Sequence, residues 1–311
     1  MRIAYLLVVH DNPGVLKKLI AALLCQDCGF FIHIDQKSDT CRFSGIKGDN
    51  VFLSRERISV YHSGFTQVEA TLLLLRQALS QPQDYDYFVL LGGTHYPLRS
   101  KEYIHRFFEK NRGWEFISTK RMPDDAYGMP LSKLNRIYFE ENAPVRRFVT
   151  RGLAKVGLAQ RDHRKCLGVL EPYGGSNWWA LTREACRYVI EFVQSNESVS
   201  RFFQHTCCPD EMFFHTILGN SPFRSCVRRN FTYLQMPAGQ RPRFLNSSHL
   251  QQIEWLDRPW LDDEWGSGEA LFARKFSDDN LNVLDQIDAM IKQKEATSEP
   301  ADLACVRPQF L

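Results

Sequence analysis

Residues 3–37 constrain the fold of this chain more than any other segment. An unbroken apolar run over residues 3–9 has the length of one buried strand, and a helical pattern of apolar residues follows Pro13. Residues 30–34 form a second run, rich in aromatic and β-branched residues, that ends at Asp35. Strand, helix and strand in this order indicate a βαβ unit, and hence a parallel sheet that is buried on both faces.

Later segments extend this pattern into an α/β domain. Further elements are expected as short strands at 51–53 and 58–61, a helix at 68–79, and a buried strand at 87–91 that runs into a loop at 92–97. Ligands of open α/β sheets bind outside the carboxyl ends of the strands, so Asp35 and this loop are expected to face one crevice. His95 in the loop is either a ligand contact or an ordinary loop histidine, and the sequence leaves both open.

Composition argues against several classes of protein. Of the 311 residues 44% are hydrophobic, which is ample for one large α/β domain or two small ones. The net charge of +3 is small and the basic residues are scattered, whereas a nucleic-acid-binding protein needs a basic stripe. Their local clusters leave an anionic ligand or peripheral contact with membrane headgroups open. No run approaches the roughly twenty apolar residues of a transmembrane segment.

The cysteines fit a reducing compartment. There are nine, an odd number at irregular spacing, which suits reduced thiols better than a disulfide framework. Cys25 and Cys28 have redox or zinc spacing, but no second such pair completes four ligands, so buried thiols are the favoured interpretation. The adjacent Cys207 and Cys208 are interpreted as incidental. Because no secretory leader precedes the first strand, the expected location is cytoplasmic.

Two acids stand at the start of an apolar helical pattern. Pro209 suits a first helical position, and apolar residues recur at helical spacing from Phe213 to Leu218. Asp210 and Glu211 are therefore expected in the first turn of a helix. Acids are common there because they complement the helix dipole, but a carboxylate held ionised at that place can also act as a general base.

An aromatic strand follows a glycine turn at residues 174–175. It ends near Thr182, which can cap the next helix. Trp178 and Trp179 are adjacent and so point to opposite faces of the strand. One is expected in the core, and the other is either a platform for a sugar ring or ordinary aromatic packing.

The usual phosphate-binding glycine motifs are absent from the sequence. Neither G-x-G-x-x-G nor G-x-x-x-x-G-K-[ST] occurs, which removes the support for a dinucleotide or P-loop site and for a dehydrogenase. The one literal Asp-x-Asp motif runs from Asp84 to Asp86. It precedes its strand, and so lies at the wrong end for a metal ion that serves a nucleotide sugar.

Six motifs in a fixed order resemble those of one enzyme family. They are Ala4 to His10 with Asn12-Pro13, Ile32 to Lys37, Leu90-Leu91-Gly92 with Tyr96-Pro97-Leu98, Gly175-Ser176-Asn177-Trp178, Pro209-Asp210-Glu211 with Phe214-His215-Thr216, and Phe272 to Phe276. The set resembles the core-2/I-branching β-1,6-N-acetylglucosaminyltransferase and peptide O-xylosyltransferase family, glycosyltransferase family 14, with a bacterial-type start. The resemblance implies an α/β fold of GT-A-like, Rossmann-type nucleotide-sugar-binding architecture, with a mixed, mostly parallel central sheet flanked by helices. It also implies a UDP-sugar donor and inversion at the anomeric carbon without a metal ion or other cofactor.

The resemblance assigns roles to particular residues. Glu211 corresponds to the catalytic base and Asp210 to its support, while Lys275 corresponds to the lysine that binds the donor diphosphate. Arginine and lysine can donate directly to phosphate oxygens, so Arg274 and an upstream arginine, Arg241 in preference to Arg243, are expected to assist. The donor pocket is expected to include Asp35, Lys37, Ser63 and Gly64, and the sugar or acceptor pocket Gly92, His95, Ser176, Asn177 and Trp178.

Two departures from the family pattern lie near this pocket. His62-Ser63-Gly64 stands where relatives carry a tryptophan and two glycines, and His95 stands where many carry an acid. Both changes concern the sugar and the acceptor. They leave the diphosphate-binding residues and the base unaltered.

The predicted organisation is one GT-A-like domain over residues 1–277, followed by a C-terminal helix and a loosely ordered tail over 278–311. Within the domain, a donor-binding part reaches about 118, an acceptor-side insertion spans about 119–172, and a catalytic part spans about 173–277.

The predicted activity is metal-independent transfer of N-acetylglucosamine from a UDP-sugar to a hydroxyl of a glycan or glycolipid. A UDP-xylose-dependent xylosyltransferase is the first alternative, and a non-catalytic glycan- or nucleotide-sugar-binding protein is the second. The expected cellular location is the cytoplasm, and a peripheral position at the inner membrane is left open.

Overall fold

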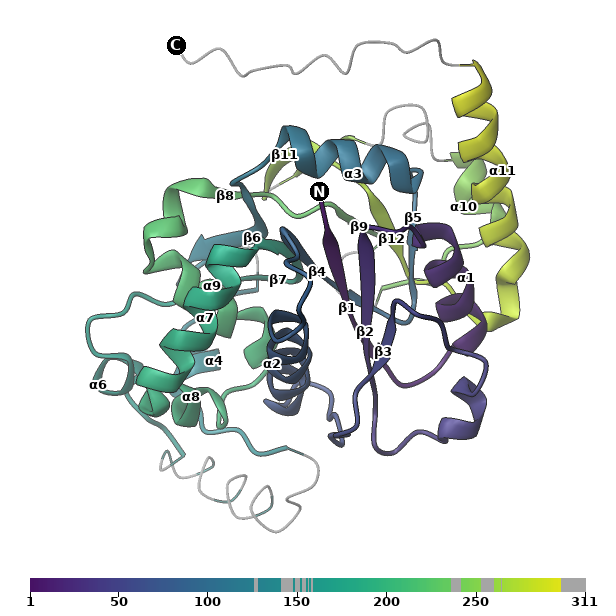
Figure 1. Cartoon of the computed structure of the whole chain (residues 1–311). Helices are drawn as coiled ribbons and strands as arrows, with labels where there is room; N and C mark the ends of the chain where they lie inside the picture. Colours follow the sequence, from purple (N-terminus) through teal and green to yellow (C-terminus); the bar gives the residue numbers. More distant parts are fainter. Residues whose placement is uncertain are drawn as a thin grey trace.

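A seven-stranded sheet forms the centre of the part of the chain that the structure describes (Figure 1). This computed structural model describes residues 1–125, 128–140, 159–235, 242–252, 260–263 and 265–297, with the single residues 148, 152, 155 and 157. The strand order is β3-β2-β1-β4-β7-β6-β8. The strands are β1 (Ile3–Val9), β2 (Cys28–Ile34), β3 (Val51–Leu53), β4 (Tyr87–Gly92), β6 (Glu115–Arg121), β7 (Tyr173–Thr182) and β8 (Val227–Arg228).

The sheet is mixed and mostly parallel, which confirms the predicted fold class. Strands β3, β2, β1 and β4 run parallel to one another, in the order of one half of a Rossmann fold. Strand β7 is antiparallel to both β4 and β6, and β8 is parallel to β6. The carboxyl ends of β1, β2 and β4 therefore meet at one edge, where a ligand crevice is expected.

Successive side chains of the central strands point to opposite faces of the sheet, which divides the interior into two cores. In β1, Tyr5 and Leu7 face one core while Ala4 and Leu6 face the other. All four side chains are 0% exposed, as expected when helices cover both faces of a parallel sheet. The unbroken apolar runs in the sequence arise from this burial on both sides.

Helices cover each face of the sheet (Figure 1). The first core is covered by α1 (Pro13–Leu23), α3 (Lys101–Lys110) and α11 (Leu281–Thr297). The second is covered by α2 (Thr66–Leu79), α7 (Arg183–Ser195), α8 (Glu197–Phe203) and α9 (Phe213–Gly219). Shorter elements connect these helices, namely η1 (Thr40–Phe43), α4 (Ser132–Asn135), α6 (His163–Leu167), η3 (Pro209–Glu211), η4 (Pro222–Cys226), α10 (Ser247–Gln252) and η6 (Asp278–Asn280).

A small second sheet was not predicted from the sequence. Its order is β5-β12-β9, with β5 (His95–Pro97), β12 (Phe272–Arg274) and β9 (Thr232–Leu234). A separate hairpin pairs β10 (Trp260–Asp263) with β11 (Gly266–Glu269). The three strands of the small sheet come from segments far apart in sequence, and all of these short strands lack the length needed for a periodic signal.

The predicted strand at 58–61 is wrong. Ile58 lies beside the end of β2, but its backbone N–H donates to Nε2 of the buried His33 at 2.8 Å instead of joining a ladder. The backbone N–H of Tyr61 donates to the hydroxyl of Thr66 at 2.9 Å, which turns the chain into α2. Side-chain acceptors therefore replace strand pairing in this segment.

The C-terminal helix packs against the first helix of the chain, and Figure 1 shows α11 alongside α1. Asp278 accepts hydrogen bonds from the backbone N–H groups of Gly14 and Val15 at 3.1 and 2.8 Å, and its own N–H donates to the side chain of Asn12 at 2.9 Å. Asn12 makes no side-chain cap of its own, so Asp278 caps α1 from the far end of the chain. Of the predicted C-terminal helix and tail over 278–311, residues 298–311 lie outside the described residues, and the predicted division of the domain stays a prediction.

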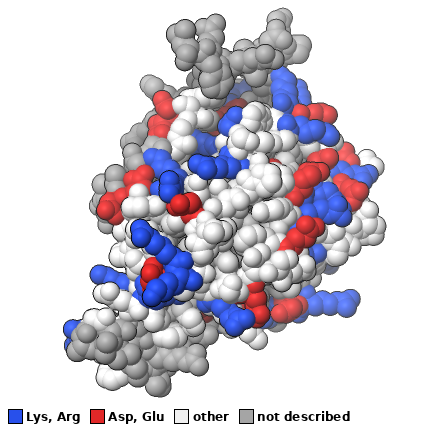
Figure 2. All heavy atoms as spheres, turned by 90° about the vertical axis from the view of Figure 1, so that its left-hand side faces the viewer, with Lys and Arg blue, Asp and Glu red and all other residues white. Residues whose placement is uncertain are grey.

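Charged side chains of both signs are interspersed on the face that carries α6 to α9. Figure 2 shows them around an uncharged central area, and neither sign forms a continuous stripe among the residues described on that face. No helix in the described ranges combines the length and apolar character needed to cross a bilayer.

Replacement of Asp278 tests the cap. We expect Asp278→Ala to lower the free energy of unfolding by about 1–2 kcal/mol, because two N–H groups of α1 lose their acceptor. Asp279→Ala is the matched control, since that exposed carboxylate is hydrogen-bonded only within its own turn. Urea unfolding measures both variants, and equal losses would contradict the role of Asp278.

Candidate active site

Asp35 and Lys37 form an ion pair at the carboxyl edge of the sheet. The backbone N–H of Asp35 donates to the carbonyl of Val9 at 2.8 Å, which ties the ends of β2 and β1 together. The nearly buried carboxylate of Asp35 accepts from the Lys37 ammonium at 3.0 Å and from the Lys37 backbone at 2.8 Å. The same ammonium lies 4.3 Å from the ring centre of Tyr61. The Lys37 side chain is 45% exposed, so this predicted donor pair borders solvent.

The loop that precedes α2 meets the loop that carries the two acids. The backbone N–H of Cys208 donates to the carbonyl of Ser63 at 2.9 Å. Both residues have left-handed backbone angles, with φ of 53° and 61°, which costs a non-glycine residue ~1–3 kcal/mol. Gly64 faces the side chain of Glu140, and a Cβ on Gly64 would collide with it. The predicted donor residues Ser63 and Gly64 therefore lie next to the acids.

Glu211 lies in a 3-10 turn and not in the first turn of an α-helix, so that expectation is wrong. The turn η3 ends at Glu211, Met212 departs from helical geometry with φ −136° and ψ −30°, and α9 begins at Phe213. Met212 is 0% exposed at this break between the two elements. The dipole of α9 therefore does not act on Glu211 through a shared first turn.

Lys133 supplies the positive charge beside Glu211. Its Nζ donates to Oε2 of Glu211 at 3.0 Å, and both side chains are partly exposed. Burial by itself lowers the pKa of Lys133, but the charge and hydrogen bond of Glu211 outweigh burial, so the pKa of Lys133 is raised. Lys133 therefore stays protonated over the physiological range. Sequence patterns could not indicate Lys133, because α4 is one turn long and belongs to no motif.

The Asp210 carboxyl group points inward beside Glu211. Burial, then the charge of Glu211 and that of Cys208, raise the pKa of Asp210 to about 8. Nδ2 of Asn177 donates to Oδ2 of Asp210 at 3.2 Å, while Oδ1 is buried with no partner among the described residues. At neutral pH Asp210 is therefore mainly protonated.

Two side chains of α9 fix strand β7 beneath the acids. Burial lowers the pKa of His215 to about 4, so the imidazole is neutral, and its Nε2 lies 2.9 Å from the carbonyl of Ser176 as a donor. The hydroxyl of Thr216 bonds to both the N–H and the carbonyl of Tyr173 at 3.2 Å. A Cβ on Gly175 would collide with the carbonyl of Ser118, so glycine permits this close approach. The position of Asn177, and through it Asp210, follows from this contact.

Trp178 and Trp179 point to opposite faces of β7, as predicted. Trp179 is fully buried against Phe214, whereas Trp178 is partly exposed. The Arg274 guanidinium lies 4.6 Å from the centre of the Trp178 ring, as expected of a cation–π contact. Burial lowers the pKa of Arg274 to about 10, so it remains a cation at neutral pH.

Gly92 and His95 pack against the Trp178 ring. His95 is 0% exposed, meets the Trp178 ring edge-on at 4.3 Å, and its Nδ1 accepts from the backbone N–H of Gly92 at 3.0 Å. A Cβ on Gly92 would lie 3.1 Å from the indole. His95 packs against Trp178 in the interior, its Nε2 has no hydrogen-bond partner among the described residues, and its contact with a ligand stays a prediction.

Lys275 follows β12 at the same edge as Trp178. Its carbonyl accepts from the backbone N–H of Leu245 at 2.8 Å, and its ammonium lies 5.7 Å from the ring centre of Phe244. Arg241 lies outside the described residues, while the exposed Arg243 is held by its backbone N–H on the carbonyl of Gln235 at 3.0 Å. The choice between these arginines as partner of Lys275 stays a prediction.

The two acids of the literal Asp-x-Asp motif make structural contacts. Asp84 pairs with Arg183 at 2.6 Å, and Asp86 accepts from the backbone N–H of Arg2 at 2.7 Å. Both acids precede β4 and so lie at the opposite end of the sheet from Asp35. Within the described ranges, three or more His, Cys, Asp or Glu side chains nowhere converge as a metal-binding group.

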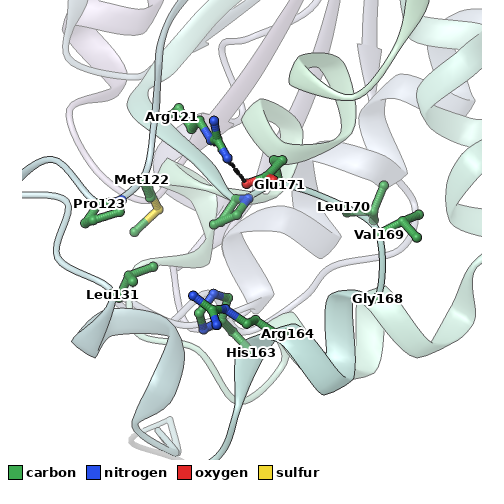
Figure 3. A pocket seen from close by; sticks show the side chains of 11 residues that line it. Arg121, Met122, Pro123, Leu131, His163, Arg164, Gly168, Val169, Leu170 and Glu171 are labelled. Atoms are coloured by element: carbon green, nitrogen blue, oxygen red, sulfur yellow. Dashed lines mark hydrogen bonds and ion pairs between the residues drawn. The ribbon is translucent and has the colours of Figure 1, made fainter.

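A pocket of about 580 Å³ opens beside this site (Figure 3). All of its lining residues fall within 119–172, the segment predicted to face the acceptor, and Arg121 and Glu171 pair across it at 2.7 Å. Leu131 in its wall immediately precedes α4, the helix that carries Lys133. His163, also in the wall, bonds through Nδ1 to Asn135 at the end of α4, at 2.8 Å. The helix α4 thus connects this pocket to Glu211.

Two sets of contacts bring most of the predicted residues together. From Asp210, one set leads through Asn177 to its neighbour Trp178 and on to Arg274 and Lys275. From Cys208, the other leads to Ser63, near Tyr61 and Lys37. These contacts connect the two acids and Lys133 with Trp178, Arg274 and Lys275, and their roles in catalysis stay a prediction.

Comparison with known proteins identifies relatives of this chain. The family model described as "Core-2/I-Branching enzyme" matches residues 3–254. Human xylosyltransferase 2 is 28% identical over 304 residues, which cover 93% of this chain and 33% of that protein. Rat xylosyltransferase 1 is 27% identical over 232 residues, covering 71% of this chain and 26% of that protein.

A solved structure, the apo form of mouse xyloside xylosyltransferase 1, is a more distant match, with a TM-score of 0.36 and 12% identity over 90% of this chain and 99% of that one. This chain spans about a third of the length of the xylosyltransferase 2 sequences that it matches.

The raised pKa of Asp210 predicts a pH dependence of stability. The unfolded carboxyl group ionises near pH 4 and the folded one near pH 8, so unfolding releases a proton between these values. We therefore expect the free energy of unfolding to fall as the pH rises from about 4 to about 8, and Asp210→Asn to remove this contribution.

Glu115 provides the comparison for this measurement. It is 1% exposed, and burial raises its pKa to about 7, so the contribution that Glu115→Gln removes should end about one pH unit lower. Urea unfolding from pH 5 to 9 resolves the two. An unchanged profile in Asp210→Asn would show that Asp210 ionises normally in the folded protein.

Proposed function

Because this chain belongs to the Core-2/I-branching enzyme family, we propose that it is a glycosyltransferase that uses a nucleotide-sugar donor. The observation that carries the proposal is the arrangement around Glu211. A carboxylate paired with Lys133 lies in the turn that Asn177 ties to Trp178, and Trp178 stacks on Arg274, the neighbour of Lys275. Base and cations are thus held in one framework.

The proposed reaction is a single displacement with inversion. Oε2 of Glu211 is engaged by Lys133, and Oε1 takes the proton from the acceptor hydroxyl. The acceptor oxygen bonds to the anomeric carbon while the bond from that carbon to the diphosphate oxygen breaks, and the electron pair leaves with the nucleotide diphosphate. Asp210 is mainly protonated at neutral pH and so cannot take the acceptor proton, which leaves that role to Glu211.

Lys275 and Arg274 are proposed to stabilise the leaving diphosphate. Arg274 remains charged although burial lowers its pKa, and its guanidinium is fixed over the Trp178 ring. Charged donors aimed at phosphate oxygens in a partly dry site stabilise charge that develops in the transition state. This role is the support for transfer without a divalent metal ion.

Relatives favour xylose over N-acetylglucosamine as the donor sugar. The sequence favoured N-acetylglucosamine, but the similar curated proteins reported above are named xylosyltransferases. We therefore propose UDP-xylose as the first donor to test. The acceptor is proposed to be a hydroxyl of a glycan, glycolipid or peptide that approaches from the pocket of Figure 3, because α4 connects that pocket to the base.

Replacement of Glu211 tests the proposed base. We expect Glu211→Gln to lower the transfer rate by at least ~10²-fold, since the amide cannot accept the proton, while UDP affinity by calorimetry stays within a few-fold of wild type. Glu197→Gln is the matched control, because Glu197 forms an exposed ion pair with Arg201 on α8. Full activity of Glu211→Gln would remove Glu211 as the base, and binding without turnover in the wild type would favour a non-catalytic binding protein.

Thermal unfolding with candidate donors tests the sugar and the metal requirement. A ligand bound to the native state raises Tm according to its affinity, so UDP-xylose should raise Tm more than UDP-N-acetylglucosamine at equal concentration. The shift should persist with excess chelator and fall in Lys275→Ala. A larger shift with UDP-N-acetylglucosamine would restore that donor. Loss on chelation with rescue by Mn²⁺ would establish a metal requirement.

A further inference from the structure

Cys25 and Cys28 hold their sulfur atoms in one turn at the amino end of β2. The backbone N–H of Cys25 donates to Sγ of Cys28 at 3.0 Å, and the Cys28 thiol lies 3.0 Å from the carbonyl of Cys25 as a donor. Asp27 in the turn accepts from the backbone N–H of Ile3 at 2.9 Å, which fixes the turn to β1. The ends of a four-residue turn lie within about 7 Å, a separation that a disulfide can bridge.

His105 lies against the outer of these two thiols. Its Nε2 is 3.3 Å from Sγ of Cys25. The helix that carries it, α3, is fixed at its start by the ammonium of Lys101, which donates to the carbonyl of Leu24 at 2.9 Å. An imidazole at this distance can take the thiol proton and stabilise a thiolate.

The two sulfurs differ in charge and in access. The neighbouring Cys28 side chain, opposed by burial and assisted by His105, lowers the pKa of Cys25 to about 5. The pKa of Cys28 is raised well above its usual range, first by the hydrogen bond to Cys25 and then by burial. Cys25 is partly exposed beside the 46% exposed Leu24, whereas Cys28 is 3% exposed. An accessible thiolate beside a buried thiol is the arrangement of an attacking and a resolving cysteine.

Tyr5 adds a buried hydroxyl to this group. Its side chain is 0% exposed, and its hydroxyl has no partner among the described residues. Burial, and then charge on Cys28 and Cys25, raise the pKa of Tyr5, so the phenol stays protonated within electrostatic reach of both sulfurs. A neutral donor there can stabilise negative charge as it moves from one sulfur to the other.

We propose that Cys25 and Cys28 form a thiol–disulfide exchange site whose substrate is a small, solvent-borne disulfide. The Cys25 thiolate attacks one sulfur of this disulfide, and the first small thiol leaves with the proton that His105 had taken from Cys25. The sulfur of Cys28 then attacks Sγ of Cys25, and the second small thiol leaves with the Cys28 proton. Two cysteine thiols are oxidised to one disulfide, and one small disulfide is reduced to two thiols.

This site is independent of the proposed sugar transfer. It lies at the amino end of β2, whereas Asp35 follows the carboxyl end of the same strand. The second close pair, Cys207 and Cys208 with sulfurs 3.8 Å apart, precedes the candidate base and provides an internal comparison. Cys41 and Cys166 are exposed and serve as ordinary thiols.

The test uses the full chain and oxidised glutathione. Peptide mass spectrometry after rapid alkylation should find a Cys25–Cys28 disulfide that glutathione reverses. Cys28→Ser should stop at a glutathione adduct on Cys25, and Cys25→Ser should give neither product. At pH 6–7 the alkylation of Cys25 should exceed that of Cys41 by roughly tenfold or more, and His105→Phe should move the midpoint of its pH profile upward.

Three results would overturn the proposal. They are a Cys25 that reacts no faster than Cys41 in the wild type, a disulfide that forms at Cys207–Cys208 but not at Cys25–Cys28, and an adduct on Cys25 that Cys28 never resolves. The wild-type alkylation rates decide the matter even if Cys28→Ser fails to fold.

Discussion

The approach of α9 to β7 is the contact on which the rest of the candidate site depends. His215 and Thr216 bond to the backbone of β7 at Ser176 and Tyr173, and Gly175 permits the distance. A glycine is needed on the strand because any larger residue would push it into Ser118 of β6. The two acids lie just before α9, and Trp178 lies in β7 two residues after Ser176, so this contact positions both. A neutral, buried imidazole thus has a structural task here, although histidine near a carboxylate invites a catalytic interpretation.

The cations Arg274 and Lys275 are positioned by the small sheet and not by the contact of α9 with β7. Strand β12 pairs with β5 and β9, so Arg274 and Lys275 emerge beside the loop that follows β4. Arg274 then stacks on Trp178, and the buried His95 meets the indole edge-on. The two departures from the family pattern therefore differ in consequence. His95 acts through the packing of Trp178, whereas Ser63 bonds directly to the loop of the acids.

Patterns with a strong period were predictable from the sequence. The βαβ start, the two cores and the opposed tryptophans follow from apolar runs and from alternation along strands. The small sheet, Lys133 and the cap by Asp278 were not predictable, because each joins segments far apart in the chain through one short element. The error at Glu211 has a specific cause: helical spacing from Phe213 onward does not show that the buried Met212 interrupts the helix. Burial of His95 was likewise decided by partners that arrive from β7 and β12.

The cap that Asp278 places on α1 also has a consequence for the order in which the protein assembles during synthesis. During synthesis the βαβ unit leaves the ribosome before β12 and η6, so at that stage the first N–H groups of α1 are open to water and the small sheet lacks its middle strand. Only when β12 and η6 emerge can the cations take their place beside Trp178 and the cap form. Under the proposed function, a nascent chain cannot hold a donor diphosphate in the complete site until β12 and η6 have emerged.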